Sequence, residues 1–219
     1  TSYRYLIRMS HLNTPSRLFA IIPAAGLSRR MGTHKLLLTL GQETVIQRLV
    51  RGLSAPFITQ IVIVARKDDA LLKEHLTGMN LQLIQPETDP PDMKVSVQIA
   101  LAWIQAHYQP SATDGWLLIP ADHPVLNGAV IDELYQSWQN CQDSCMIPTF
   151  QGQKGHPAFF RWSVSHDVFR LKDEEGINAL WKNHNIQPLL QECPYPEILI
   201  DLDTPEDYES LKQRYSTER

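Results

Sequence analysis

Three uninterrupted apolar runs place the strongest constraint on the fold of this chain. They occupy residues 18–23, 61–65 and 116–120. A strand that is apolar at consecutive positions has both faces buried, as in a parallel sheet covered by helices on either side. Segments with apolar residues at helical spacing lie between these runs, at residues 44–53, 68–76 and 95–107, and a short strand is predicted at 81–84. This alternation predicts an α/β fold, a three-layer α/β/α sandwich with a mostly parallel, Rossmann-like sheet.

The last third of the chain is more mixed. Strands are predicted at residues 145–150, 157–161 and 197–202, a short helix at 173–184 and a closing helix at 204–215. Residues 1–17 alternate poorly and precede the first clear strand, so we interpret them as an N-terminal extension, with Met9 as the hypothesised natural start. The remaining residues, 18–219, have the length of a single domain.

Composition and charge exclude several classes of protein. Hydrophobic residues make up 43% of the 219, enough for a sizeable core, and a net charge of −4 offers no general basic surface for nucleic acid. No apolar stretch approaches the roughly 20 residues that cross a bilayer, so no membrane partner is expected. Three cysteines (Cys141, Cys145 and Cys193) without a CxxC pair argue against a disulfide framework or a cysteine metal site. We expect a reduced, cytoplasmic protein whose anion sites are built locally.

A basic loop with two glycines follows the first apolar run and reads "AAGLSRRMGTHK". Gly26 and Gly32 let the backbone approach an anion closely, and successive N–H groups can form an anion-binding concavity. Ser28 adds a hydroxyl, Arg30 a planar fork for bidentate phosphate contact, and Lys35 a compact positive charge. The composition of this loop predicts a phosphate site.

The spacing of this loop excludes the two commonest phosphate loops. A Walker A loop needs G-x-x-x-x-G-K-[ST], whereas here five residues separate Gly26 from Gly32, and no serine or threonine follows Lys35. A dinucleotide fingerprint needs G-x-G-x-x-G at the start of a helix, and that pattern is absent too. A solvated basic turn stays as the simpler alternative to a nucleoside triphosphate loop of another kind.

The longer segment "PAAGLSRRMGTHKLLLTLGQETVI" resembles the signature loop of the nucleotidyltransferases related to molybdenum cofactor cytidylyltransferase, the MobA-like NTP transferases. The matching residues are Ala24, Ala25, Gly26, Ser28, Arg30, Met31, Gly32, Lys35, Leu36, Leu37 and Gly41. The resemblance implies a sheet of the nucleotide-diphospho-sugar transferase type and a loop that wraps a triphosphate. It also implies that Arg30 and Lys35 are catalytic and that the matching residues from Ala24 to Lys35 bind the nucleotide. The guanylyltransferase branch usually has glycine where Ala25 stands, so Ala25 indicates a pyrimidine nucleotide, CTP.

Asp122 follows the third apolar run, in "LLIPADHPVL". A carboxylate at the carboxyl end of a central strand lies where α/β sheets bind ligands, and its oxygens suit Mg²⁺. A turn or N-cap aspartate is the simpler alternative. The segment resembles the [G/A]-D-x-P element of the family, which implies that Asp122 is a metal ligand and a catalytic residue. His123 stands at the variable position of that element and is assigned no role.

The segment "KGHPAFF" places His156 just before a predicted strand. Taken alone, it predicts a turn with a half-buried histidine. The G-H-P-x-x-F pattern resembles the cytidylyltransferase branch, where it borders the acceptor pocket. We therefore expect His156 to bind an acceptor phosphate, with a charge that varies near neutral pH.

The segment "LIDLDTPEDYE" predicts the start of the closing helix, with Thr204 as N-cap, Pro205 at the first helical position and an acid, Asp207, three residues after the cap. Asp201 and Asp203 alternate on the predicted strand and so face the same side. Two such carboxylates repel each other unless a cation lies between them. The family has a similar D-x-D-T-P-E-D close, and this resemblance implies that Asp203 completes the metal site.

One departure from the family pattern lies just before the predicted helix at residues 95–107. The family usually shows G-[ML]-x-x-S there, whereas this chain has Asp92 in place of the glycine and keeps Met93 and Ser96. The resemblance implies that Ser96 borders the nucleotide. With Asp92 in place of glycine, the backbone must adopt a conformation that a residue with a side chain allows. Asp92 also adds negative charge beside a phosphate site. Both points leave the nucleotide preference and the activity open.

The predicted function is transfer of CMP from CTP to a phosphate acceptor with release of pyrophosphate and with Mg²⁺ as cofactor. The resemblance implies a molybdopterin-type acceptor, a molybdoenzyme as a further partner, a nucleotide-binding part at about 18–125 and an acceptor-binding part at about 126–203. Two alternatives stay open. One is a nucleotidyltransferase for a sugar- or alditol-type phosphate, although His34 rather than a proline precedes Lys35 and no H-D-x-A-R element occurs. The other is a non-catalytic chaperone that binds nucleotide or molybdenum cofactor, and Asp92 keeps it open.

Overall fold

A computed structural model describes residues 16–26, 34–183 and 186–215. Within these ranges one eight-stranded sheet forms the centre of the molecule, with strand order β10-β7-β9-β6-β1-β4-β5 and with β8 paired to β7. Its strands are β1 (Leu18–Pro23), β4 (Ile58–Val64), β5 (Gln82–Ile84), β6 (Gly115–Leu118), β7 (Cys145–Phe150), β8 (Gln153–Lys154), β9 (Ala158–Arg161) and β10 (Leu189–Glu192). A separate hairpin consists of β2 (Thr39–Leu40) and β3 (Glu43–Thr44).

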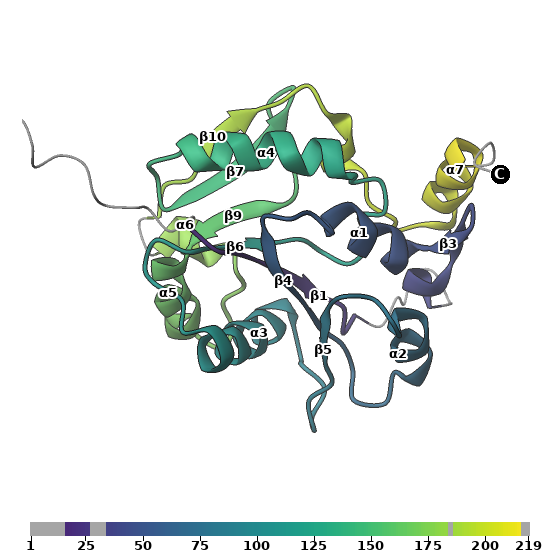
Figure 1. The fold of residues 1–219 in the computed structure, drawn as a ribbon, viewed down its shortest axis with the longest axis horizontal. Helices are drawn as coiled ribbons and strands as arrows, with labels where there is room; N and C mark the ends of the chain where they lie inside the picture. The colour runs from purple at the N-terminus through teal and green to yellow at the C-terminus, as the bar shows by residue number, and fades with distance from the viewer. Residues whose placement is uncertain (1–15, 27–33, 184–185, 216–219) are drawn as a thin grey trace, which may run out of the picture.

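Helices connect the strands and cover the sheet (Figure 1). The α-helices are α1 (Val45–Leu53), α2 (Ala70–Leu76), α3 (Met93–Tyr108), α4 (Gly128–Asn140), α5 (Ser165–Arg170), α6 (Ala179–Asn183) and α7 (Pro205–Tyr215). Short 3₁₀ helices are η1 (Lys35–Leu37), η2 (Trp162–Val164) and η3 (Pro196–Leu199). A search of the described residues finds no helix with the length and apolar character that a membrane span requires.

Strand pairing confirms the predicted α/β class with a mostly parallel sheet. β1 is parallel to β4 and β6, β4 is parallel to β5, and β7 is parallel to β10, whereas β9 is antiparallel to both β6 and β7. The strands β5-β4-β1-β6 follow the 3-2-1-4 order of a doubly wound sheet. The winding therefore reverses between β1 and β6, and the carboxyl ends of these two strands border the crevice where such sheets bind ligands.

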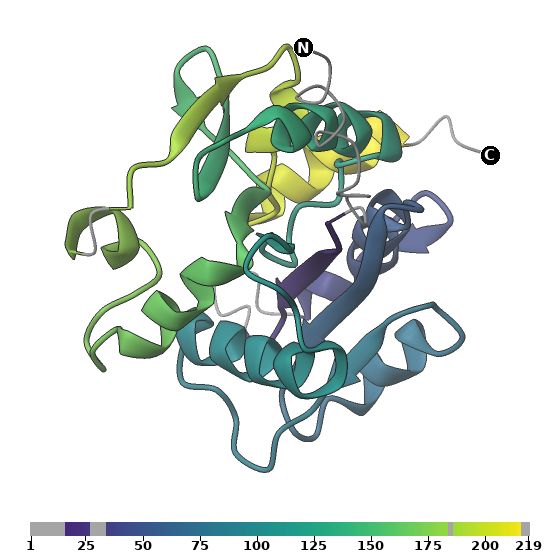
Figure 2. The same ribbon diagram turned by 60° about the vertical axis from the view of Figure 1, so that its left-hand side comes forward.

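Alternate residues of β1 belong to two cores on opposite faces of the sheet. Leu18, Ala20 and Ile22 pack in the core that α1 and α4 cover, while Phe19 and Ile21 pack in the core that α3 and α5 cover. All five residues are at most 1% exposed, as expected for a strand buried on both faces. Figures 1 and 2 show the two helical layers on either side of the sheet, which confirms the predicted three-layer sandwich.

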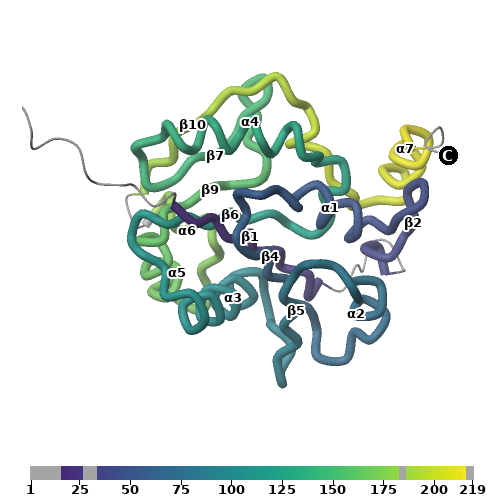
Figure 3. The backbone as a smooth tube through the Cα atoms, in the orientation of Figure 1, coloured from purple at the N-terminus to yellow at the C-terminus, as the bar shows by residue number. Residues whose placement is uncertain are grey.

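Helices α1 and α7 begin at capping boxes that can be recognised in the sequence. In α1 the side chain of Thr44 accepts a hydrogen bond from the main-chain N–H of Gln47, whose side chain accepts one in return. In α7 the hydroxyl of Thr204 accepts from the N–H of Asp207 at 3.2 Å, and the carboxylate of Asp207 accepts from the N–H of Thr204 at 2.8 Å. The predicted helix start at Thr204 is confirmed, and it places α7 beside β2 (Figure 3).

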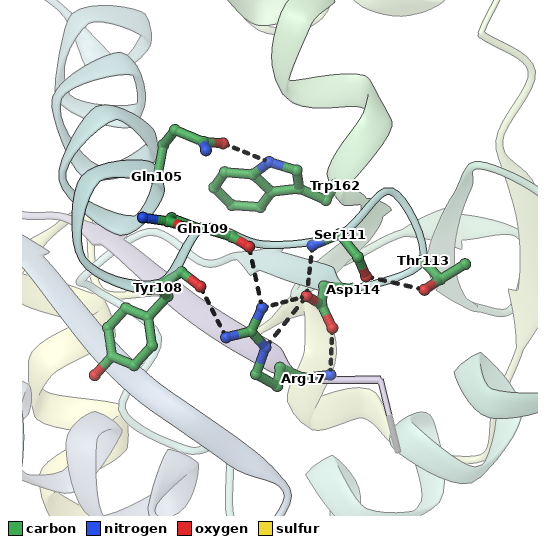
Figure 4. A network of polar contacts seen from close by, with 8 residues as sticks. All are labelled: Arg17, Gln105, Tyr108, Gln109, Ser111, Thr113, Asp114 and Trp162. Carbon is green, nitrogen blue, oxygen red and sulfur yellow. Dashed lines mark hydrogen bonds and ion pairs between the residues drawn. The ribbon is translucent and has the colours of Figure 1, made fainter. Parts of the chain in front are cut away.

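A partly buried network joins the amino ends of β1 and β6 to the end of α3 (Figure 4). The guanidinium of Arg17 donates to Oδ2 of Asp114 at 2.8 and 3.2 Å and to the main-chain oxygen of Tyr108 at 2.9 Å. Burial raises the pKa of Asp114, but hydrogen bonds from Arg17 and Ser111 outweigh it, so the net pKa is lowered. The network holds two neighbouring strands together at the ends opposite the crevice.

Gly52 of α1 is a point of close approach between α1 and the segment before α4. A Cβ at this position would lie 2.2 Å from the main-chain oxygen of Leu126. We expect Gly52→Ala to lower the free energy of unfolding by about 2 kcal/mol, because overpacking that forces the backbone to shift costs roughly 1–3 kcal/mol. Gly128→Ala is the matched control, since nothing in the described residues lies within 4 Å of a Cβ there. Urea denaturation measures both variants, and equal stabilities would contradict the prediction.

The predicted strand at residues 197–202 is wrong. In the described structure this segment forms η3 and then an extended chain that pairs with no strand. The strand in this part of the chain is β10, which pairs with β7 and was not predicted. Pro196 favours the first position of a helical turn, and Ile198 is fully buried with its main-chain oxygen bonded to the N–H of His156. The apolar pattern of 197–202 thus reflects packing of an irregular segment. β10 gave no such pattern because Leu189 and Leu190 are exposed at the sheet edge.

The predicted helix at 173–184 is shorter in the structure and corresponds to α6. Turns and irregular chain occupy the preceding residues, where the ammonium group of Lys94 on α3 donates to the main-chain oxygens of Lys172 and Asp173 at 2.6 and 2.9 Å. These carbonyl groups are therefore engaged with another helix. Helices α4 and α5 lie in segments for which no element is predicted above.

Candidate active site

A cavity of about 380 Å³ opens at the carboxyl ends of β1 and β6, at the reversal of winding. Its volume is typical of small-molecule sites, which range over about 300–1,000 Å³. Segments that are distant in the sequence line it, namely Pro23, Ala24, Ala25, Gly26, Lys35, Leu36, Pro90, Pro91, Asp92, Met93, Ser96, Pro120, Ala121, Asp122 and Asp203. The fold therefore places several of the predicted site residues around one concave surface.

The ammonium group of Lys35 lies between two carboxylates at this cavity. Its Nζ donates to Oδ2 of Asp122 at 2.6 Å and to Oδ1 of Asp203 at 2.8 Å. Lys35 begins η1, Asp122 follows β6 and Asp203 precedes α7. Lys35 is separated from Asp122 by 87 positions along the chain and from Asp203 by 168. Tertiary structure rather than local sequence therefore brings these charges together.

The pKa values of Asp122 and Lys35 reflect this pairing. Burial raises the pKa of Asp122, but hydrogen bonds from His123 and Lys35 and the charge of Lys35 outweigh burial and lower that pKa to about 2. Burial lowers the pKa of Lys35, but hydrogen bonds to Asp122 and Asp203 and their charges outweigh it and raise that pKa. Asp122 is therefore an anion and Lys35 a cation at neutral pH, and the site can attract both a metal cation and a phosphate.

Asp203 reaches the cavity through the start of α7 and not through a strand. The expectation that Asp201 and Asp203 share one face of a strand is wrong, because no strand forms in this described segment. The main-chain N–H of Leu202 donates to the main-chain oxygen of Asp122 at 2.9 Å, which ties the segment to the loop after β6. The N–H of Asp203 also donates to Oδ2 of Asp207 at 3.1 Å. The capping box of α7 thus helps to place Asp203.

His123 belongs to this site, although the sequence interpretation gave it no role. Its Nδ1 lies 3.0 Å from Oδ1 of Asp122, and its side chain is 6% exposed. Its ring meets that of His156 edge-on, with centroids 4.9 Å apart. A buried polar ring needs a hydrogen-bond partner. The position of His123 directly after Asp122, in an apolar segment, is the sequence signal that could have identified this contact.

His156 is not among the described residues that line the cavity, and its ring contacts that of His123 instead. Its Nδ1 is buried without a partner in the described ranges. Burial and His123 lower the pKa of His156 to about 4, against the opposing effects of Asp122 and Leu118. The expected change of charge near neutral pH is therefore wrong, because His156 is neutral there. Its role in acceptor binding stays a prediction.

Asp92 replaces the family's glycine by acting as the N-cap of α3. Its φ of −152° and ψ of 176° are extended backbone that any residue adopts, and its Oδ1 accepts from the N–H of Val95 at 2.9 Å. The hydroxyl of Ser96 donates to the main-chain oxygen of Asp92 at 3.2 Å, and both residues line the cavity. The backbone therefore needs no glycine here, whereas the negative charge remains beside the cavity.

The charge of Asp92 can be separated from its capping role by two substitutions. Asn caps helices as well as Asp does, so we expect Asp92→Asn to leave stability unchanged and to strengthen nucleotide triphosphate binding about threefold, the effect of one exposed charge. Asp92→Ala removes the cap too and should lower the free energy of unfolding by about 1 kcal/mol. Calorimetric titration and urea denaturation measure the two effects. Weaker binding by Asp92→Asn would show that the carboxylate assists the nucleotide.

Part of the basic loop lies outside the described residues, namely Ser28, Arg30, Met31 and Gly32. Their predicted phosphate contacts stay predictions. The residues before them are described: Ala24, Ala25 and Gly26 line the cavity directly after β1. The N–H of Ala24 donates to the main-chain oxygen of Val64 at 2.8 Å, which holds the start of the loop against the end of β4.

The chain that returns from this loop is anchored just before Lys35. Nε2 of His34 lies 2.8 Å from Oδ2 of Asp69, whose other oxygen accepts from the N–H of Leu72 and so caps α2. The side chain of Asp69 is 4% exposed, so this contact is well shielded from water. The anchor connects α2 to the residue that precedes the lysine of the site.

Asp122 and Asp203 are the residues that could hold a metal ion. The parts of the chain that the structure describes contain no group of three or more His, Cys, Asp or Glu side chains that could hold a metal. Mg²⁺, however, commonly uses one or two protein carboxylates and completes its coordination with water and substrate phosphates. Two carboxylates that already share one cation, the ammonium of Lys35, have the oxygen donors that this ion prefers. The residues fit Mg²⁺ that binds together with a nucleotide.

The fold is similar to that of proteins of known structure. A nucleotidyl transferase from Methanothermobacter thermautotroptrophicus superposes with a TM-score of 0.75 at 20% identity, over 93% of this chain and 99% of that chain. Rv0371C from Mycobacterium tuberculosis H37Rv, in complex with manganese, superposes with a TM-score of 0.68 at 22% identity, over 91% and 100%. At these identities the likeness establishes the fold.

Sequence comparison assigns the family. The family described as "MobA-like NTP transferase domain" matches residues 20–188, so this chain belongs to that family and is a nucleotidyltransferase. Molybdenum cofactor cytidylyltransferase of Escherichia coli (strain K12) is 25% identical over 203 residues, which cover 92% of this chain and 98% of that protein. Molybdenum cofactor guanylyltransferase of Cereibacter sphaeroides is 29% identical over 150 residues, which cover 68% and 70%. The resemblance found in the sequence is confirmed.

Proposed function

We propose that this enzyme transfers the cytidylyl group of CTP to a phosphate-bearing acceptor of the molybdopterin type, with Mg²⁺ as cofactor. An oxygen of the acceptor phosphate forms a bond to the α-phosphorus of CTP, the bond from that phosphorus to the bridging oxygen of the β-phosphate breaks, and pyrophosphate leaves. The step balances without a redox partner and without a covalent intermediate on the enzyme.

The observation that carries this proposal is the meeting of Lys35, Asp122 and Asp203 at one cavity. Nucleotidyl transfer asks little covalent chemistry of the protein, because its rate depends on positioning and on neutralising phosphate charge. An ammonium group held by two carboxylates is a charge arrangement suited to that task. The cavity lies at the reversal of winding, where doubly wound sheets bind nucleotides.

Each residue has a role that follows from its chemistry. Asp122 and Asp203 would hold Mg²⁺, which when bound neutralises charge on the phosphates. Lys35 supplies a positive charge for a phosphate oxygen, and its raised pKa keeps it protonated at neutral pH. Ala24, Ala25 and Gly26 border the nucleotide through a loop segment that leaves β1 at the cavity. Together these groups hold the triphosphate for attack by the acceptor.

The choice of CTP rests on Ala25 and on the relatives. Ala25 stands where the resembling guanylyltransferases usually have glycine, it borders the cavity, and the Escherichia coli relative that aligns over nearly the whole chain is a cytidylyltransferase. We expect Ala25→Gly to shift the ratio of kcat/KM for CTP and GTP about tenfold toward GTP, since a methyl group in a pocket contributes roughly 1–3 kcal/mol to discrimination. An unchanged ratio would remove Ala25 from the determinants of base choice.

A pyrophosphate-release panel tests the proposed function. Wild-type protein is given each of CTP, GTP, ATP and UTP with Mg²⁺, and either a molybdopterin-type or an alditol phosphate acceptor. We expect turnover with CTP and the molybdopterin-type acceptor, at a rate at least about tenfold above that with GTP. A preference for GTP would reassign the base, and turnover with the alditol phosphate alone would reassign the acceptor. Tight CTP binding without turnover in any combination would contradict a catalytic role.

A further inference from the structure

The two carboxylate oxygens of Asp122 have different partners. Oδ2 accepts from the ammonium of Lys35 at 2.6 Å, and Oδ1 lies 3.0 Å from Nδ1 of His123. The main-chain oxygen of Asp122 accepts from the N–H of Leu202 at 2.9 Å, so backbone and side chain are both held. With one oxygen bonded on each side, the plane of this carboxylate has little freedom to rotate.

His123 is itself held in place. Its side chain is 6% exposed, and its ring meets that of His156 at 4.9 Å with an interplanar angle of 80°. His156 is held in turn through its main-chain N–H, which donates to the main-chain oxygen of Ile198 at 2.9 Å. The packed ring of His156 therefore limits the orientations that the ring of His123 can adopt.

The contact between His123 and Asp122 does not depend on the charge of the imidazole. A carboxylate accepts only, so Nδ1 must carry the hydrogen, and it does so both in the imidazolium and in one of the neutral tautomers. The contact can therefore persist whichever of these forms is present. Its contribution is to geometry, because it fixes the direction of Oδ1 in a residue that lines the cavity.

From these contacts we infer that His123 is a positioning residue, which orients the Asp122 carboxylate for metal binding at the nucleotidyltransferase site. The inference rests on the proposed function, since it assigns His123 a role through Asp122. Removing a side chain that orients a metal-binding carboxylate typically weakens metal binding or activity about 10–100-fold. His123 stands at a position to which the family pattern assigns no particular residue.

The test compares two substitutions that differ in the hydrogen-bond donor. His123→Phe keeps a buried ring and removes the donor, whereas His123→Asn places an amide N–H₂ close to the position of Nδ1. Binding of Mn²⁺ to each protein with CTP present is measured by electron paramagnetic resonance, and kcat and KM for CTP are measured alongside. We expect His123→Phe to weaken Mn²⁺ binding at least about tenfold and to lower kcat more than KM, and His123→Asn to stay within about threefold of wild type.

Two outcomes would overturn the inference. Wild-type Mn²⁺ binding in His123→Phe would show that the contact does not matter, and equal losses in both variants would show that His123 only fills space. Thermal unfolding checks that the variants fold, and His123→Leu replaces the phenylalanine variant if that variant does not. Asp122→Asn serves as the reference for the site itself. If it binds Mn²⁺ as wild type does, the proposed function of Asp122 fails independently of His123.

Discussion

Replacing Asp122 with asparagine is expected to lower the rate of pyrophosphate release about 1,000-fold. The substitution keeps the shape of the side chain and removes the charge that pairs with Lys35 at 2.6 Å and that would hold Mg²⁺. Removing one group that stabilises charge in a transition state commonly costs about 10²–10³ in kcat, and loss of a metal ligand falls at the upper end of that range. Binding of CTP in the absence of metal should change little, because Lys35 keeps its contact with Asp203.

Asp201 provides the matched control for this experiment. It is an aspartate of the same segment as Asp203, and burial together with Asp122 and Asp203 raises its pKa, with His123 opposing. Asp203, not Asp201, makes the contact with Lys35. Asp201→Asn is therefore expected to stay within about threefold of wild type, the effect of one nearby charge. If Asp122→Asn still releases pyrophosphate at the wild-type rate, the catalytic role of Asp122 is rejected. If Asp201→Asn loses this activity, Asp201 rather than Asp203 is the second acidic residue of the site.

Acidification from pH 7 to pH 5 is expected to lower the free energy of unfolding by about 2 kcal/mol through His156. Burial lowers the pKa of this histidine to about 4, with a further lowering by His123. In the unfolded chain a histidine has a pKa of about 6.5. Between these two values the unfolded chain binds a proton that the folded protein does not bind, so stability falls as the pH falls.

The sign and the pH range of this effect follow from the lowered pKa. The stabilisation is fully present above about pH 6.5 and is lost as the pH falls through about 4. The difference of 2.5 pKa units between 6.5 and about 4 corresponds to about 3.5 kcal/mol at about 1.4 kcal/mol per unit, and more than half of it is lost by pH 5. The pKa of Asp122 is lowered to about 2, so the stabilisation from this carboxylate is lost only below about pH 4. His156 and Asp122 therefore change stability in separate pH ranges.

His156→Gln is the substitution that isolates this effect. Glutamine cannot titrate, and its side chain remains polar. Urea denaturation at pH 7 and pH 5 is expected to show a pH dependence about 2 kcal/mol smaller in this variant than in wild type. The exposed His166 on α5 is the control, and His166→Gln should keep the wild-type dependence. If His156→Gln also keeps it, another group is responsible for the acid sensitivity.

The sheet and most of its helices could be predicted from the sequence because their signals are local. Uninterrupted apolar runs predicted β1, β4 and β6, since residues buried on both faces cannot alternate with polar ones. The capping residues Thr44 and Thr204 mark helix starts through contacts only three residues long. The edge strand β10 escaped prediction because its apolar side chains, Leu189 and Leu190, are exposed.

The sequence by itself determined the class of fold, the glycine-rich basic loop and the family, because each depends on residues that are neighbours along the chain. Only the tertiary structure decided which distant groups meet. Lys35 reaches Asp122 across 87 residues and Asp203 across 168 residues. The neutral state of His156 likewise follows from burial and packing. Such contacts depend on strand order and loop packing, for which no local pattern in a single sequence carries a signal.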